Sequence, residues 1–450
     1  MKTKAQSIAD SLIEAINNKI YTEKLPSEKE LSVLYKTTPV TAGKALNILK
    51  DDGIVARVPG RGTFIQDLNK EQKISLLLRR DSTQEYINLW QKIKKIIEKK
   101  FNNIIFEVNI SSISYDKAIE QGEHDLYINF SFINNHLYQY FVPFQGEFDR
   151  LLQSNKYYFS KISFAHRENA LLYGLPYTFS PMVIFVNKSL FEQNFNENLP
   201  TEITTAQLID YAQRFANRQN QDKLFIELLG SANLFNWFSG ALLNKNIKNI
   251  FELETVEYQQ FLKVFENLYR ESFTEDKSFF DGDFLFRYSN RQFVFKMNDK
   301  QSDVDFDVIS IRCENDMGGG FASESLFIHQ KCQNIDAAQK ICNEIISDEV
   351  QTLIGTSFLG IPINKIAALD SVNNKNFKDY LFFDSIGNIS AHNAVYSLET
   401  LEMFIGIIQS FVYSELSKED FEQQMLRVFE YHKFADQSKA ENHLAEEMFS

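Results

Sequence analysis

The apolar residues of the first 70 positions recur at intervals of three and four, which is the spacing of amphipathic helices. This spacing predicts three short helices, over residues 4–18, 28–35 and 39–52. Each helix is too short to be stable alone, so the three must bury their apolar faces against one another. The pattern therefore predicts a small helical domain at the N-terminus.

Local start and stop signals support the second and third of these helices. Ser27, with Glu30 three residues further on, forms a capping box, in which each side chain satisfies a backbone N–H at the helix start. Thr38 followed by Pro39 is typical of an N-cap and a first helical residue, because proline lacks the N–H that would otherwise be unpaired there. Gly53 supplies the left-handed residue expected just past a helix end.

Two short β-prone runs, residues 54–57 and 63–65, follow the third helix. They flank Pro59-Gly60-Arg61-Gly62, a turn sequence that places a cation between two glycines. Three helices followed by a hairpin with a basic tip predict a winged helix.

Beyond a polar segment at 67–72, the pattern changes to alternating strands and helices. A buried strand is predicted at 73–78, an amphipathic helix at 86–101, and further strands at 104–110 and 125–130. Strand, helix and strand at this spacing form a βαβ unit, so we expect a parallel sheet covered by helices.

Composition and charge narrow the choice of protein class. The 450-residue chain is 44% apolar and 24% charged, which is ordinary for globular domains and excludes wholesale disorder. It contains no run of about 18 apolar residues, so no membrane span is predicted.

The N-terminus and the cysteines indicate the compartment. The N-terminal segment MKTKAQSIAD has no apolar signal region, which favours a cytoplasmic location. The three cysteines show no metal-binding spacing and are expected to be reduced, buried thiols.

The net charge of −13 is unevenly distributed along the chain. Residues 1–70 carry 11 Lys+Arg and 8 Asp+Glu, a net +3, whereas the other 380 residues carry 36 and 52, a net −16. Such an asymmetry indicates two segments with different tasks, of which only the first suits nucleic acid.

The N-terminal segment resembles the DNA-binding domain of the GntR family of bacterial transcription regulators. The resemblance lies in three motifs, LPSEKEL, TPVTAGKAL and DDGIVARVPGRGTF. The resemblance implies a homodimer on double-stranded operator DNA, with the third helix in the major groove and the wing beside it. Two positions depart from the family pattern, because Pro39 and Gly43 stand where basic residues are common, so the operator sequence cannot be carried over. The DNA contacts that the resemblance implies are Ser27, Lys29, Thr38, Thr41, Lys44, Arg57, Arg61 and Gly62.

Three later segments, YGLPYTFSPMVIFVNKSLF, NLFNWFSGALL and the stretch from SESLFIHQK to GIPINK, resemble family 1 extracellular solute-binding proteins of the maltose-binding type. The resemblance implies a carbohydrate effector held by aromatic and polar side chains. Asn129 and Ser180 differ from the maltose-type residues, so maltose itself is not implied. The implied ligand contacts are Asn129, Ser180, Phe235, Trp237, Phe321 and Glu324.

The sequence thus predicts an α/β protein, with an N-terminal winged helix-turn-helix and a two-lobed, type II periplasmic-binding-protein-like domain. The domains are expected at 1–70 and 73–450, with crossings between lobes near 178–182, 308–313 and 360–366. The predicted function is a transcription regulator, not an enzyme, whose operator affinity responds to a sugar or oligosaccharide in the cleft. No cofactor and no metal are expected, because the histidines show no ligand spacing.

Two alternatives remain open from the sequence. GntR-type winged helices also occur joined to an aminotransferase-like domain that binds pyridoxal phosphate through a lysine. The other alternative is a cytosolic sugar-binding module that does not regulate DNA. The identity of the effector, the operator sequence and the sign of the regulation cannot be read from the chain.

Overall fold

The computed structural model divides the chain into two compact units. Unit 1 comprises residues 1–73 with 98–105, and unit 2 comprises residues 74–97 with 106–450. The structure describes residues 3–58, 62–65, 71–130, 135–144, 147–152, 154–158, 162, 167–168, 171–216, 222–227, 277–312, 320–389 and short stretches between 403 and 431.

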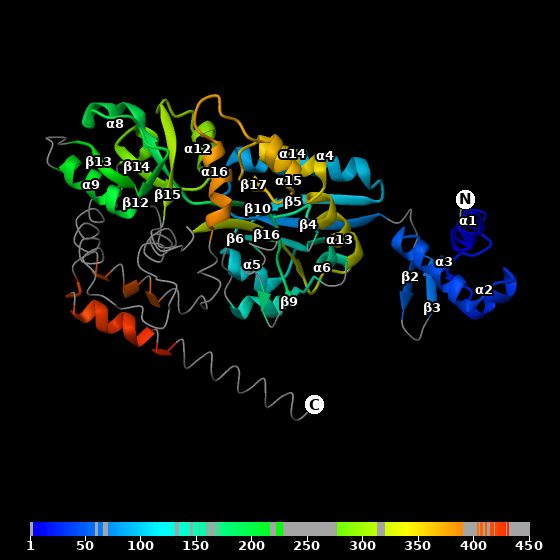
Figure 1. Cartoon of the computed structure of the whole chain (residues 1–450). Helices are drawn as coiled ribbons and strands as arrows, with labels where there is room; N and C mark the ends of the chain where they lie inside the picture. The colour runs from blue at the N-terminus through cyan, green and yellow to red at the C-terminus, as the bar shows by residue number, and fades with distance from the viewer. Residues whose placement is uncertain are drawn as a thin grey trace. The chain divides into compact units, whose positions relative to one another are not determined.

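Unit 1 contains three helices and a small antiparallel sheet (Figure 1). The helices begin and end close to the predicted positions, and the strand order is β1-β3-β2. This is the winged helix that the sequence predicts. The elements are α1 (Lys4–Asn17), β1 (Lys24–Leu25), α2 (Glu28–Leu34), α3 (Pro39–Asp51), β2 (Val55–Val58) and β3 (Gly62–Ile65).

The caps predicted from the sequence are present in unit 1. Ser27 and Glu30 form the complete capping box of α2, and Thr38 caps α3 with its side-chain oxygen. Gly53, which follows α3, has a φ of 71°, the left-handed conformation that glycine adopts without strain. One apolar core joins the three helices to β2, and it includes Leu12, Leu31, Leu46, Leu49 and Val55.

Unit 2 is built on two sheets. The larger sheet has the order β17-β10-β16-β6-β4-β5, with β7 beside β16, and the smaller has the order β12-β15-β11-β14-β13. Figure 1 shows α4 (Gln84–Lys100), α14 (Asp348–Thr356) and α15 (Lys365–Asp370) along one face of the larger sheet and α5 (Tyr115–Gln121) on the other.

The strands of the larger sheet are β4 (Gln72–Leu78), β5 (Ile104–Ile110), β6 (Leu126–Phe130), β7 (Phe141–Val142), β10 (Leu175–Pro181), β16 (Phe321–His329) and β17 (Ile361–Pro362). Those of the smaller sheet are β11 (Val183–Asn187), β12 (Glu202–Thr204), β13 (Leu224–Glu227), β14 (Phe284–Ser289) and β15 (Phe306–Arg312). A short separate pair is formed by β8 (Arg167–Glu168) and β9 (Leu171–Leu172). The other helices are α6 (Glu147–Leu152), α8 (Lys188–Asn194), α9 (Thr205–Ala216), α12 (Gln292–Asp299), α13 (Ile335–Ile345) and α16 (Tyr380–Asp384), with short 3-10 turns η1 (Asn135–Tyr140), η4 (Phe279–Asp281) and η5 (Ser385–Asn388).

The expectation of a parallel sheet holds for only part of the larger sheet. β4 and β6 are parallel, as the βαβ pattern predicts, but β16 runs antiparallel to β6 and β10 runs antiparallel to β16. The parallel arrangement expected from the βαβ unit is therefore found between β4 and β6, and the larger sheet as a whole is mixed. The reason is that β10 and β16 are not products of a βαβ step, since the chain connects both of them to strands of the smaller sheet.

The chain passes between the two sheets at several points. Only Met182 separates β10 of the larger sheet from β11 of the smaller one, and residues 313–320 connect β15 back to β16. Residues 360–366 stay with the larger sheet, where β17 pairs with β10. Further along, the chain contacts β15 of the smaller sheet through Phe377, whose ring centroid lies 5.2 Å from that of Phe306, and through Lys378, whose backbone N–H donates to Asp307 at 2.8 Å.

Candidate functional site

Helix α3 of unit 1 presents a short polar face at its start. Thr38 Oγ1 accepts the backbone N–H of Thr41 at 3.2 Å, and the two hydroxyls lie 3.0 Å apart. Thr38 and Lys44 are exposed, whereas Thr41 is half-buried. The cap thus fixes the first turn of α3 and leaves Lys44 as a cation one turn further along.

The start of α2 carries two of the predicted DNA contacts. Ser27 Oγ accepts the backbone N–H of Glu30, and the Glu30 carboxylate accepts the backbone N–H of Ser27 at 2.7 Å. These two bonds lower the pKa of Glu30 below its ordinary value. The Ser27 hydroxyl can still donate its proton, and Lys29 beside it is exposed. A phosphate at this position would therefore be held by these side chains and not by the Ser27 N–H.

The wing side of unit 1 is tied to the helices by an ion pair. Arg57 of β2 pairs with Glu28 of α2, and its Nη1 donates to Asn47 Oδ1 of α3 at 2.6 Å. The guanidinium of this predicted DNA contact is thus already engaged within the unit. Gly62 is exposed at the start of β3 with a φ of 117°, and Arg61 lies outside the described residues.

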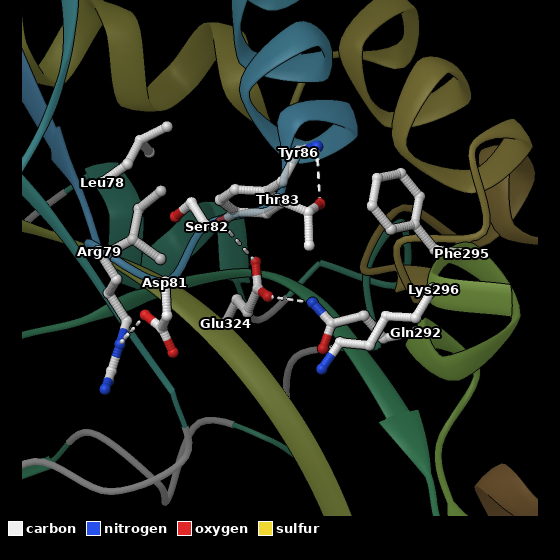
Figure 2. A pocket seen from close by; sticks show the side chains of 11 residues that line it. Leu78, Arg79, Asp81, Ser82, Thr83, Tyr86, Gln292, Phe295, Lys296 and Glu324 are labelled. Atoms are coloured by element: carbon white, nitrogen blue, oxygen red, sulfur yellow. Dashed lines mark hydrogen bonds and ion pairs between the residues drawn. The ribbon is translucent and has the colours of Figure 1, made fainter. Parts of the chain in front are cut away.

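A pocket opens in unit 2 with a cavity volume of about 100 Å³. Figure 2 shows its side chains, which come from the larger sheet, from the turn before α4, from the first turn of α4 and from α12. Since α12 follows β14 of the smaller sheet, the pocket lies where the two sheets of unit 2 meet. The lining residues are Leu78, Arg79, Asp81, Ser82, Thr83, Tyr86, Ile128, Gln292, Phe295, Lys296 and Glu324.

Glu324 of β16 is the central polar group of this pocket. Its side chain is buried, with 3% of the residue exposed, and its carboxylate accepts hydrogen bonds from the hydroxyls of Tyr86 and Tyr177 and from the amide of Gln292. Burial raises the pKa of the Glu324 carboxyl above its ordinary value. Burial also raises the pKa values of Tyr86 and Tyr177, so both phenols remain donors at neutral pH.

The two tyrosines that donate to Glu324 pack against a buried tryptophan ring. Trp90 of α4 contacts Tyr86 and Tyr177 edge to face, with ring centroids 6.5 and 5.8 Å apart. Trp90 is fully buried, so it fixes both tyrosine rings and, through them, the position of the Glu324 carboxylate.

The charged groups of the pocket balance in sign. Arg79 lies 3.4 Å from Asp81, and Lys296 stands on α12 near Glu324. Partial burial lowers the pKa of Lys296. The lining thus holds as many basic side chains as acidic ones, which suits an uncharged ligand with many hydroxyl groups, because such a ligand needs both donors and acceptors and adds no charge to be compensated.

The predicted ligand contacts are only partly brought together at this pocket. Glu324 lines it, but Asn129 occupies the face of β6 opposite to Ile128, which lines the pocket, because neighbouring residues of a strand point to opposite sides. Ser180 Oγ accepts the backbone N–H of Arg291 and donates to Pro181. Phe321 is buried at the start of β16, and Phe235 and Trp237 lie outside the described residues.

Arg291 connects the pocket helix α12 with the elements around the larger sheet. It is fully buried and paired with Asp379, which is also fully buried. Its Nε donates to Asp379 at 2.8 Å, and its remaining donors bond to carbonyl oxygens of Gly355, Gly360 and Ser371. Because Gln292 follows directly in sequence, this cluster fixes the residue that donates to Glu324.

Sequence reasoning missed Tyr86, Tyr177, Gln292 and the Arg291 cluster. The tyrosines lie 91 residues apart, and Tyr86 lies 238 residues from Glu324, so no local spacing links them. The one local signal was Thr83, whose Oγ1 accepts the N–H of Tyr86 at 3.3 Å at the start of α4.

Among the residues that the structure describes, no group of three or more metal-ligating side chains is close enough to hold an ion. No helix in the described part of the chain is long and apolar enough to cross a membrane.

The sequence comparisons identify the first unit. Residues 4–65 match the family model described as bacterial regulatory proteins, gntR family, which confirms the resemblance drawn from the sequence motifs. No curated protein sequence matches the chain significantly.

The structural comparisons concern most of the remaining chain. A maltose-bound T. maritima MalE3 superimposes with a TM-score of 0.63 at 13% identity, covering 81% of this chain and 99% of that one. The sugar-binding protein MalE from Xanthomonas citri gives 0.62 at 16% identity, covering 82% and 99%. An ABC substrate-binding protein from Listeria monocytogenes, solved with cycloalternan, gives 0.62 at 11% identity, covering 81% and 99%. These likenesses confirm the predicted solute-binding-protein fold.

Proposed function

We propose that this chain, which joins a winged helix of the gntR family to a domain with the fold of MalE-type sugar-binding proteins, is a transcription regulator controlled by a sugar. The observation that carries the proposal is that both units occur in one chain, and that unit 2 has a pocket where its two sheets meet. The winged helix within residues 1–70 binds operator DNA as a homodimer in the cytoplasm. Residues 73–450 form the effector domain, which binds and does not catalyse.

The chemistry of the pocket supports a sugar as the effector. Glu324 offers a buried carboxylate as acceptor, and Ser82, Thr83 and Gln292 offer further polar atoms. Phe295 provides an apolar surface on the side of α12, where Figure 2 shows its ring. Stacking surfaces combined with carboxylate and amide groups suit the C–H faces and hydroxyls of a carbohydrate.

The position of the pocket supports ligand control. A sugar that contacts both the larger sheet and α12 holds the two sheets of unit 2 in one arrangement, and a ligand shifts an equilibrium by its differential affinity for the two states. A coupling of about 1 to 3 kcal/mol changes operator affinity by about 5 to 150-fold. The fold shared with these substrate-binding proteins supports this proposal over the aminotransferase alternative.

Thermal unfolding against a panel of mono- and oligosaccharides tests the proposal. Both tryptophans of the chain, Trp90 and Trp237, lie after residue 73, so tryptophan fluorescence reports on unit 2 alone. A sugar at 100 times its Kd is expected to stabilise unit 2 by about 2.7 kcal/mol. The same sugar should change the retardation of operator DNA by the full-length chain.

A variant pair makes the test specific to the pocket. Glu324→Gln should weaken sugar binding by about 10 to 150-fold, because hydrogen bonds to charged groups contribute about 1.5 to 3 kcal/mol. Glu349→Gln, on the exposed start of α14, is the control and should leave sugar binding unchanged. If sugars bind without changing DNA affinity, ligand control is wrong. If the chain retards no duplex in a salt-sensitive manner, the chain is a sugar-binding module without DNA regulation.

A further inference from the structure

The outward face of α3 carries an exposed apolar side chain at its start. Val40, Lys44 and Asn47 are spaced by four and three residues, so they lie on one face of the helix, and all three are exposed. Val40 is 69% exposed, whereas the core positions of the same helix, such as Leu46, are almost fully buried. Val40 therefore does not serve the core of unit 1.

Around Val40, the hydroxyls of Thr38 and Thr41 bond to each other at the helix cap, and the neighbouring positions offer few other polar side chains to base edges. Pro39 has no hydrogen-bonding side chain, and Gly43 is buried against the Glu28 carboxylate, which lies 2.9 Å from the position that a Cβ would occupy. Glu28 in turn holds the Arg57 guanidinium, whose other end bonds to Asn47. Beside the paired hydroxyls of Thr38 and Thr41, the start of α3 thus offers Val40 as an apolar group and Lys44 as a cation.

We propose that Val40 recognises the 5-methyl group of thymine in the major groove of the operator. This inference rests on the proposed function, because it requires that α3 enters the groove of a duplex. The N-terminal residues of a recognition helix lie nearest the base edges. Of the four bases only thymine presents a methyl group there, and apolar side chains contact that group. The isopropyl group of Val40 supplies such a contact, and Lys44 on the same face supplies attraction to the phosphates.

The proposal predicts a specific chemistry of the operator half-site. A thymine stands opposite Val40, and its methyl group, not only its hydrogen-bonding edge, contributes to affinity. Deoxyuridine differs from thymidine only by lacking this methyl group, so replacing the one by the other removes the contact and leaves base pairing intact.

The experiment uses the full-length chain and an operator selected from random duplexes. Each thymine of the half-site is replaced by deoxyuridine in turn, and Kd is measured by electrophoretic retardation at fixed salt. For the wild-type chain, one replacement should weaken binding by about fourfold, the effect of burying one methyl group. Val40→Ala should bind the thymine duplex more weakly and show no further loss with deoxyuridine, whereas Val40→Ile should keep the sensitivity to the methyl group.

Val33→Ala provides the matched control, because Val33 is an equally exposed valine, at 75%, on α2. It should retain both the wild-type Kd and the wild-type methyl sensitivity. The proposal is overturned if no thymine of the half-site is methyl-sensitive, or if Val40→Ala keeps the full sensitivity. A chain that binds no duplex at all would instead contradict the proposed function, so the two failures are distinguishable.

Discussion

At the scale of single residues, Glu324 is a buried carboxylate of the pocket whose charged form is destabilised by the fold. Its carboxylate is buried among donors from Tyr86, Tyr177 and Gln292, yet burial still raises its pKa. A raised pKa means that the charged form is less stable in the folded protein than in water. The charge therefore lowers the stability of unit 2, a cost that the proposed role of Glu324 in ligand binding would account for.

This argument predicts the stability of Glu324→Gln. Because the folded-state pKa lies above the ordinary value of 4.5, the wild-type chain loses stability as the pH rises from that value through the folded-state pKa. Glu324→Gln has no such titration, so its free energy of unfolding should exceed that of the wild type at pH 7, and the excess should disappear towards pH 4.5. Denaturant unfolding followed by tryptophan fluorescence across this pH range measures the difference. The difference in the free energy of unfolding, Glu324→Gln minus wild type, should be larger at pH 7 than at pH 4.5. A smaller difference at pH 7 would contradict the argument.

At the scale of elements, Arg291 holds several of them together. One guanidinium reaches carbonyl oxygens at the end of α14, before β17 and at the end of α15, and pairs with Asp379 before α16. Carbonyl oxygens at helix ends lack some of their partners within the helix, and the Arg291 guanidinium supplies charged donors to those of Gly355 and Ser371. The position of α12 thus depends on this residue.

Arg291→Ala is expected to lower the free energy of unfolding of unit 2 by about 3 to 5 kcal/mol, because it leaves Asp379 buried without its partner. Arg214→Ala is the control. Arg214 pairs with Glu197 and Asp210 but is 41% exposed, and exposed pairs contribute at most about 1 kcal/mol. Denaturant unfolding of both variants, followed by tryptophan fluorescence, should rank them in this order. Equal losses in the two variants would show that the Arg291 cluster is not a structural centre.

At the scale of the whole molecule, the charge is divided between the two units. Residues 1–70 carry a net charge of +3, and the remainder of the chain carries −16. Unit 1 should therefore carry the DNA contact, because the duplex repels the acidic remainder. This division separates the effects of substitutions in the two units.

The salt dependence of DNA binding tests this division. Lys44→Ala should make the slope of log K against log salt shallower by about 0.9, because one phosphate contact is removed, and Arg61→Ala should add a similar change. Sugar affinity should remain as in the wild type. Lys375→Ala, an exposed lysine of unit 2, should leave the slope unchanged. A loss of sugar binding in Lys44→Ala would mean that the two units do not act separately.

The sequence alone determined those features whose causes are local. The capping box at Ser27, the N-cap at Thr38 and the left-handed Gly53 were predicted because each depends on neighbours within a few residues. The winged helix and the family resemblance were predicted from the same local sequence motifs. Glu324 was predicted as a ligand contact only through a resemblance, and the structure places it in the pocket.

Only the tertiary structure decided the composition of the pocket and the direction of the strands. Tyr86, Tyr177, Gln292 and Glu324 come from four separate segments and meet because β10, β16 and α12 are brought together by chain passages between two sheets. Contacts of this kind depend on long-range packing, and the residues involved show no regular spacing in the sequence that would predict them. The same holds for the Glu28 carboxylate that occupies the space beside Gly43, since the two residues belong to different helices.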